Sequence, residues 1–126
     1  MSSNINVLTL AYLGDSIYEL YVREKLIKDG IVKVNLLSKE AINYVSAKAQ
    51  AKFLLLLINN DILSEDEISV VKRARNHKGK SNPKNTDVLT YKHATGLEAL
   101  IGYLYLENKK ERIDELMNHI LGGNLC

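Results

Sequence analysis

The sequence lacks the features of disulfide-rich, low-complexity and membrane-spanning proteins. Its only cysteine is Cys126, so an internal disulfide and a cluster of thiolate metal ligands are both excluded. One proline and seven glycines are too few for a low-complexity chain. The longest apolar run, Phe53 to Ile58, is far shorter than the ~20 residues of a membrane span, and the N-terminus lacks the pattern of a secretory signal. We therefore expect a cytoplasmic protein without a membrane segment.

Helix-forming residues, in contrast, are abundant. Hydrophobic residues make up 46% of the 126 positions, which suffices for one core, and long runs of Leu, Ile, Ala and Lys favour helices. We therefore predict a single all-α domain over residues 1–126. Helical patterns run over 4–28, from Asn35 or Ser38 to 58 as one long helix or two short ones, from Glu65 onwards, over 91–106 and over 111–121.

Local signals refine these helices. Ser64 and Glu67 have the spacing of a capping box, so a helix should begin near Glu65. Gly14 interrupts the first apolar stripe, which indicates either a break between two helices or the close approach of another backbone. Residues 77–90 have no apolar period and are predicted to form a loop, and Gly122-Gly123 closes the last helix.

Charge is distributed unevenly along the chain. The segment from Lys72 to His93 contains seven Lys or Arg residues and one acid, Asp87. This segment carries +6 and the remainder −4, which together give the net charge of +2. A basic concentration in an otherwise acidic chain indicates a polyanionic partner, although many basic loops are merely solvated.

The basic segment offers donors suited to phosphate oxygens of RNA. No aromatic residue lies between Lys72 and Thr90, so stacking on single-stranded bases is not indicated there, and recognition of a duplex through its backbone and shape fits better. The predicted RNA-binding residues are Arg73, Arg75, Asn76, His77, Lys78, Lys80, Lys84 and Asn85.

Asp15 and Glu98 are the candidate chemical groups. Both lie among apolar positions of strongly hydrophobic helices, where an ionised carboxylate needs a partner. Asp15 could instead cap a helix that restarts after Gly14, and Glu98 could pair with a cation of the basic segment. A shared Mg²⁺ would satisfy both acids, since it takes oxygen ligands and uses few carboxylates. Glu19, one turn after Asp15, is a candidate further ligand or an exposed acid paired with Arg23.

Two motifs carry a family resemblance. Residues 10–17 read Leu-Ala-Tyr-Leu-Gly-Asp-Ser-Ile and resemble the signature helix of the ribonuclease III endonuclease domain, usually written Leu-Glu-Phe-Leu-Gly-Asp. Residues 98–105, Glu-Ala-Leu-Ile-Gly-Tyr-Leu-Tyr, resemble that family's second acidic helix. The short length and the Arg-Ala-Arg-Asn and Pro-Lys-Asn-Thr-Asp segments are more similar to the mini-ribonuclease III branch, which has no separate double-stranded-RNA-binding domain.

The resemblance implies a helical, dimer-forming catalytic domain in which Asp15 and Glu98 bind Mg²⁺, with Mn²⁺ as a substitute. Ala11 and Thr95 stand where the larger enzymes have acids, so the carboxylate count is lower here. The expected activity is endonucleolytic cleavage of double-stranded RNA, leaving 5′-phosphate and 3′-hydroxyl ends. The resemblance implies that the substrate in this branch is the precursor of large-subunit (23S) ribosomal RNA. We expect the homodimer to meet through the apolar face of the Gly14 helix.

Two other functions are consistent with the same residues. The missing acids at Ala11 and Thr95 could mark a catalytically inactive protein that binds double-stranded RNA with the same fold. The retained Asp15 and Glu98 argue against it, because a purely structural helix gains little from isolated acids. A helical scaffold for a protein partner would leave the basic segment unexplained.

Overall fold

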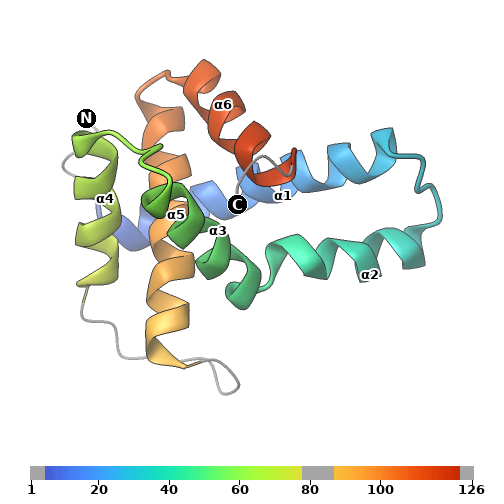
Figure 1. The fold of residues 1–126 in the computed structure, drawn as a ribbon, viewed down its shortest axis with the longest axis horizontal. Coiled ribbons are helices and arrows are strands. Elements are labelled where there is room, and N and C mark those ends of the chain that lie inside the picture. Colours follow the sequence, from blue (N-terminus) through green and yellow to red (C-terminus); the bar gives the residue numbers. More distant parts are fainter. Residues whose placement is uncertain (1–4, 78–86, 123–126) are drawn as a thin grey trace.

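The computed structural model describes residues 5–77 and 87–122, which form six helices and no strand (Figure 1). The helices are α1 (Val7–Lys28), α2 (Val34–Val45), α3 (Ala47–Asn59), α4 (Glu65–Arg75), α5 (Val88–Leu106) and α6 (Lys110–Leu121). The all-α prediction is confirmed. None of the helices in the described part of the chain is both long and apolar enough to cross a membrane.

Helix α1 runs through Gly14 without interruption. It begins after Asn6, whose side chain accepts a hydrogen bond from the Leu8 amide at 2.7 Å. The predicted break at Gly14 is therefore wrong, and the alternative, a close backbone approach, is confirmed. A Cβ atom at Gly14 would lie 1.7 Å from the carbonyl oxygen of Glu98, and one at Gly102 would lie 2.0 Å from the carbonyl oxygen of Leu10. Two glycines thus allow α1 and α5 to touch backbone to backbone.

The second helical region divides into α2 and α3 at Ser46. The Ser46 side chain accepts a hydrogen bond from the Ala49 amide at 3.1 Å and so caps α3. The predicted caps Asn35 and Ser38 are wrong, because α2 already begins at Val34 and its cap, Lys33, makes no side-chain hydrogen bond. Packing of the apolar side of α2 against the main core decides this start without a side-chain cap. In Figure 1, α1 and α2 lie side by side and extend together away from α4.

Helix α5 is central to the core. It packs against α1, α3 and α4, and side chains on several of its faces are buried. The largest fully buried side chains come from four helices, α1, α3, α5 and α6; they are Tyr18, Leu10, Leu54, Leu57, Leu97, Leu100, Ile101, Leu104, Ile113, Leu116, Met117 and Gln50. Helix α5 begins at Val88 after the cap Asp87, so the predicted loop ends earlier than expected.

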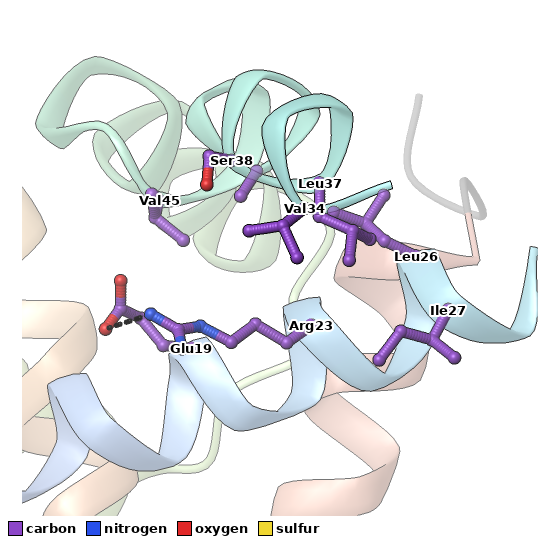
Figure 2. Close-up of a pocket in the computed structure, with 9 residues that line it drawn as sticks. Glu19, Arg23, Leu26, Ile27, Val34, Leu37, Ser38 and Val45 are labelled. Atoms are coloured by element: carbon purple, nitrogen blue, oxygen red, sulfur yellow. Dashed lines mark ion pairs between the residues drawn. The ribbon is translucent and has the colours of Figure 1, made fainter. Parts of the chain in front are cut away.

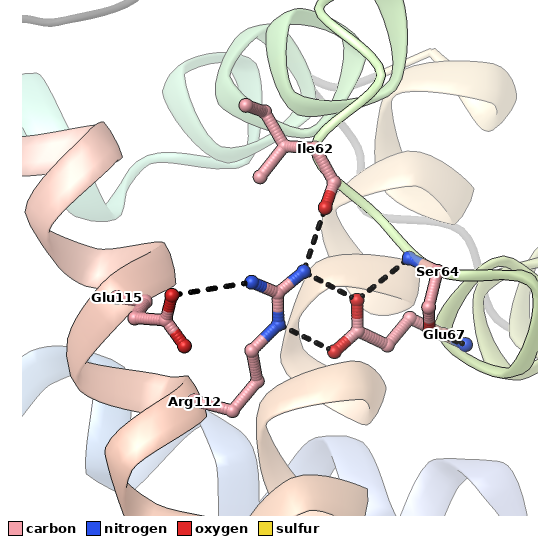
Figure 3. Close-up of polar contacts among 5 residues, drawn as sticks. All are labelled: Ile62, Ser64, Glu67, Arg112 and Glu115. Atoms are coloured by element: carbon pink, nitrogen blue, oxygen red, sulfur yellow. Dashed lines mark hydrogen bonds and ion pairs between the residues drawn. The ribbon is translucent and has the colours of Figure 1, made fainter.

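The start of α4 is held by an ionic contact from α6. The predicted capping box is confirmed, since Ser64 accepts from the Glu67 amide and the Glu67 carboxylate accepts from the Ser64 amide. Figure 3 shows the Arg112 guanidinium donating to both Glu67 oxygens at 2.8 Å and to the Ile62 carbonyl at 2.6 Å. Burial alone would raise the pKa of Glu67, but these hydrogen bonds from Arg112 and Ser64 lower it. The contact joins α6 to α4.

Candidate active site

The glycine contact brings Asp15 and Glu98 together. Asp15 directly follows Gly14 on α1, and the carbonyl of Glu98 on α5 occupies the space where a Gly14 side chain would stand. The side chains of Asp15 and Glu98 are close enough to form a hydrogen bond. Two acids separated by more than eighty positions in the sequence thus become neighbours because two backbones touch.

Asp15 is exposed, whereas Glu98 is partly buried. The sequence argument placed both acids among apolar positions, and for Asp15 the expected burial is wrong. The buried residues of α1 are Val7, Leu10, Ala11, Gly14, Tyr18, Val22 and Leu26, a stripe that excludes the position after Gly14. A capping role for Asp15 is also excluded, because α1 is continuous there and begins at its cap Asn6.

The surroundings of Glu98 favour its protonated form. Burial raises its pKa to about 8, together with the hydrogen bond and negative charge of Asp15 and the charge of Glu19. A hydrogen bond from Gln50 acts in the opposite direction. None of these influences comes from a lysine or arginine, so the contacts give no support to a salt bridge with the basic segment. Glu98 is an acid whose neighbours include two other acids.

Glu19 borders this pair and also faces a pocket. It lies 3.9 Å from Arg23 Nη2, and both line a cavity of about 420 Å³ between α1 and α2 (Figure 2). The remaining lining is mostly apolar and consists of Leu26, Ile27, Val34, Leu37, Ser38, Ala41 and Val45. The pairing with Arg23 leaves Glu19 about a third exposed at its side chain, at 37%. Glu19 thus influences Glu98 through charge while its own contact is with Arg23.

The positions that lack acids relative to the larger enzymes are packed inside the protein. Ala11 and Thr95 are each 6% exposed, and the Thr95 hydroxyl donates to the Tyr91 carbonyl at 2.9 Å. The proton of Thr95 is therefore committed to the α5 backbone. Within residues 5–77 and 87–122, no group of three or more His, Cys, Asp or Glu side chains is arranged to hold a metal ion.

Two polar side chains beside Glu98 were missed by the sequence analysis. Gln50 on α3 is 2% exposed, and its Nε2 donates to the Val45 carbonyl at 3.2 Å. Tyr18 on α1 donates its hydroxyl to the Tyr44 carbonyl at 2.6 Å, and burial, then the charge of Glu98, raises its pKa. The sequence offered one signal for Gln50. It is a polar residue at helical spacing from the apolar residues Leu54 and Leu57.

The donor set fits a hard divalent cation. Two neighbouring carboxylates supply negative oxygens. Burial is the main cause of the raised pKa of Glu98, followed by the influence of Asp15, and a bound cation would offset both. The Oε1 atom of Gln50 is buried and has no hydrogen-bond partner among the described residues, so a neutral oxygen is also available nearby. Asp15 and Glu98 are therefore the residues that would hold the ion, with water completing its shell.

Four of the predicted RNA-binding residues, Arg73, Arg75, Asn76 and His77, lie at the end of α4. Arg73 is exposed and Arg75 partly buried in the last turn, Asn76 is the C-terminal cap and His77 follows it. Arg75 acts electrostatically on His93 of α5, whose pKa is lowered first by burial and then by this charge. Basic side chains in a last turn also stabilise the helix end, so their position alone is not evidence of binding. Lys78, Lys80, Lys84 and Asn85 lie outside the described residues.

The metal-free protein is expected to lose stability as pH rises. The folded-state pKa of Glu98, about 8, exceeds its ordinary value of 4.5, so the folded state holds this proton more tightly than the unfolded state. The resulting stabilisation is fully present below pH 4.5 and is lost as pH rises toward 8. Thermal denaturation in EDTA should therefore show a larger fall in Tm between these limits for the wild type than for Glu98→Gln. Equal pH dependence of the two proteins would contradict this assignment.

Comparison with known proteins places these features in context. A family model described as the Ribonuclease III domain matches residues 8–109. A Mini-ribonuclease 3 of Enterococcus faecalis is 48% identical over 114 residues, covering 90% of this chain and 86% of the relative. A Mini-ribonuclease 3 of Brevibacillus brevis is 55% identical over 112 residues, covering 89% and 82% respectively. The crystal structure of a protein from Fusobacterium nucleatum is similar with a TM-score of 0.85 and 37% identity, covering 97% of this chain and 96% of that one.

Proposed function

The chain belongs to the ribonuclease III family of endoribonucleases, which act on double-stranded RNA, and we propose that Asp15 and Glu98 are its catalytic, metal-binding residues. The family resemblance seen in the two acidic motifs is thereby confirmed. The observation that carries the assignment of these residues is the backbone contact at the crossing of α1 and α5, which brings the side chains of Asp15 and Glu98 within hydrogen-bonding reach of each other. A third candidate acid, Glu19, lies at the edge of the pair and contacts Arg23.

Each acid has a distinct part in this site. The exposed Asp15 carboxylate is accessible to a metal ion bound to a phosphate of the RNA, whereas the Glu98 carboxylate of α5 is partly buried beside α1 and α3. We propose Mg²⁺ as the ion, with Mn²⁺ as a substitute, since both accept carboxylate oxygen and water. Such an ion supplies an activated water and stabilises charge on the phosphate oxygens, which is the chemistry that phosphodiester hydrolysis needs. The expected products carry 5′-phosphate and 3′-hydroxyl ends.

The end of α4 is proposed to contact the RNA backbone. Arg73, Arg75, Asn76 and His77 offer donors there, and the chain continues from them into Lys78, Lys80, Lys84 and Asn85. Contacts to phosphate dominate affinity and make it dependent on salt. Binding of a duplex should therefore weaken steeply as salt rises, whereas a scaffold for a protein partner would not show this dependence on RNA and salt. Catalysis and RNA binding are both assigned to this one domain.

The apolar face of α1 that contains Gly14 is buried against α5, so the expected dimer contact through that face is wrong. We propose that a homodimer forms instead through the exposed sides of α1 and α2. Large apolar side chains are exposed along these neighbouring helices, namely Leu8, Tyr12, Leu20, Ile27, Val34, Leu36 and Ile42. Exposed apolar patches on helices commonly mark interfaces. Two copies would double the phosphate contacts available to one duplex and could place one site on each strand. Sedimentation analysis of the wild-type chain measures this directly.

The proposed substrate in the cell is the precursor of large-subunit ribosomal RNA. This finer assignment is supported by the resemblance to mini-ribonucleases, and processing of such a precursor would make the protein a factor in ribosome biogenesis. We expect the chain to act in the cytoplasm, where that RNA is made in bacteria.

Incubation of the wild-type chain with a long duplex RNA tests the activity. Cleavage is expected with Mg²⁺ and not with excess EDTA, and a single strand of the same sequence should be cut far more slowly. Because the products should carry a 5′-phosphate, an RNA ligase should join their 5′ ends to an adapter without prior phosphorylation. Binding of the duplex without cleavage under every metal condition would instead support the inactive RNA-binding alternative.

A further inference from the structure

Gln50 is a buried amide in an otherwise apolar part of α3. It is 2% exposed and shares a helical face with the buried residues Leu54 and Leu57. An apolar side chain at this position would continue the core without burying any polar group. The presence of an amide here therefore needs an explanation beyond packing.

The side chain of Gln50 lies between two separate parts of the protein. Nε2 donates to the carbonyl oxygen of Val45, the last residue of α2, at 3.2 Å. The same side chain lies within hydrogen-bonding reach of Glu98 on α5, whose pKa it lowers. Gln50 thus connects the carboxylate of the active site to the junction between α2 and α3.

The amide oxygen of Gln50 has no hydrogen-bond partner among the described residues. Among the described residues, the buried side-chain atoms without a hydrogen-bond partner are Gln50 Oε1 and His119 Nδ1. Gln50 belongs to the group of side chains around Glu98, where we expect a metal ion with bound water molecules. A water molecule bound to a cation is a strong hydrogen-bond donor. An unpaired buried acceptor next to a metal-binding carboxylate is chemically suited to such a water.

We propose that Gln50 is a positioning residue of the active site, which orients the Glu98 carboxylate through Nε2 and accepts a hydrogen bond from a metal-bound water at Oε1. The proposal rests on the assignment of Asp15 and Glu98 made above. It supplies a neutral oxygen in a site whose carboxylates are few, and it explains why an amide is buried on the apolar face of α3.

Metal binding to the wild type and to Gln50→Met, measured by calorimetry with Mn²⁺ and no RNA, tests this directly. Methionine keeps the length of the side chain and removes both hydrogen-bonding groups. The affinity for Mn²⁺ is expected to fall by about 10-fold or more, the usual effect of losing a group that supports a metal ligand. The kcat for duplex cleavage should fall with it, and KM should change little.

Two further variants separate positioning from structure. Tyr18→Phe removes another buried hydrogen bond to the end of α2, the one to the Tyr44 carbonyl, without removing a bond to Glu98. It should bind Mn²⁺ like the wild type. Gln50→Glu retains a side-chain oxygen and should bind Mn²⁺ at least as tightly as the wild type. If Gln50→Met does not fold, Gln50→Glu is the variant that is compared with the wild type.

The outcomes distinguish this proposal from the assignment of the site. Asp15→Asn is titrated with Mn²⁺ beside the other proteins. If Asp15→Asn loses affinity while Gln50→Met binds and cleaves like the wild type, the role of Gln50 is overturned and the site stands. Equal losses in Gln50→Met and Tyr18→Phe, or weaker binding by Gln50→Glu than by Gln50→Met, would also overturn it. Unchanged binding by Asp15→Asn would reject the site itself.

Discussion

Replacing Asp15 with Asn is expected to lower the rate of duplex RNA cleavage by about 10³-fold or more, a loss typical of removing a group that acts on the transition state. Glu98→Gln should give a loss of the same order. Both changes keep the size of the side chain and remove one negative charge from the pair that would hold the metal ion. Cleavage is measured under single-turnover conditions at saturating Mg²⁺, so that RNA binding does not limit the rate.

The structure explains why this loss should be separable from folding. Asp15 is exposed and takes part in no helix cap, so its replacement by the amide should leave the start and the course of α1 unchanged. Burial and the neighbouring Asp15 raise the pKa of Glu98, so a neutral amide suits this position, and Glu98→Gln should not lower the stability of the metal-free protein at neutral pH. Duplex binding in the absence of metal should be retained by both variants.

Asp29→Asn is the matched control for this prediction. Asp29 is an acid at the C-terminal end of the same helix, where it pairs with Lys25 at 2.6 Å on the surface. Its replacement removes the same charge from α1 and should leave the cleavage rate within a few-fold of the wild type. If Asp15→Asn cleaves the duplex at the wild-type rate, Asp15 is not a catalytic residue. If Asp29→Asn loses as much cleavage rate as Asp15→Asn, the change in net charge is the cause.

Replacing Gly14 with Ala is expected to destabilise the fold strongly. The new Cβ would stand 1.7 Å from the carbonyl oxygen and 2.7 Å from the carbonyl carbon of Glu98, and these backbone atoms cannot rotate away. Helices α1 and α5 must then separate, which costs about 1–3 kcal/mol or more by analogy with overpacked cores. Urea denaturation measures the loss of unfolding free energy, and cleavage should fall as well, because Asp15 and Glu98 move apart.

The direction of the stability change in Gly14→Ala is informative, because helix propensity alone would make this variant more stable than the wild type. Alanine inside a helix is favoured over glycine by about 0.5–1 kcal/mol, so an unhindered Gly14→Ala would stabilise the protein. Gly96→Ala is the control on α5, since its Cβ would meet side-chain atoms of Val71 at 3.3 Å and of Leu54 at 3.5 Å and the Val71 carbonyl oxygen at 3.5 Å, all much longer contacts than the one at Gly14. A stable Gly14→Ala variant would disprove the backbone contact as the origin of the site.

Local chemistry made the helices readable from the chain. The capping box of Ser64 and Glu67 involves groups three residues apart, and it begins α4 where the spacing predicts. The wrong predictions of helix caps rested on the same local chemistry, without knowledge of the tertiary packing. Asn35 and Ser38 have good cap chemistry but lie inside α2, because packing against the core outweighs a cap worth about 1 kcal/mol.

The two acidic motifs, taken by themselves, identified the family and singled out Asp15 and Glu98, since residue types and short spacings are properties of the linear chain. Only the tertiary structure decided that Gly14 is a contact and not a break, that Asp15 is exposed, and that Gln50 and Tyr18 border Glu98. The physical reason is the same in each case. These properties depend on which atoms of distant helices meet, and α1 and α5 meet where two glycines remove the side chains that would hold their backbones apart.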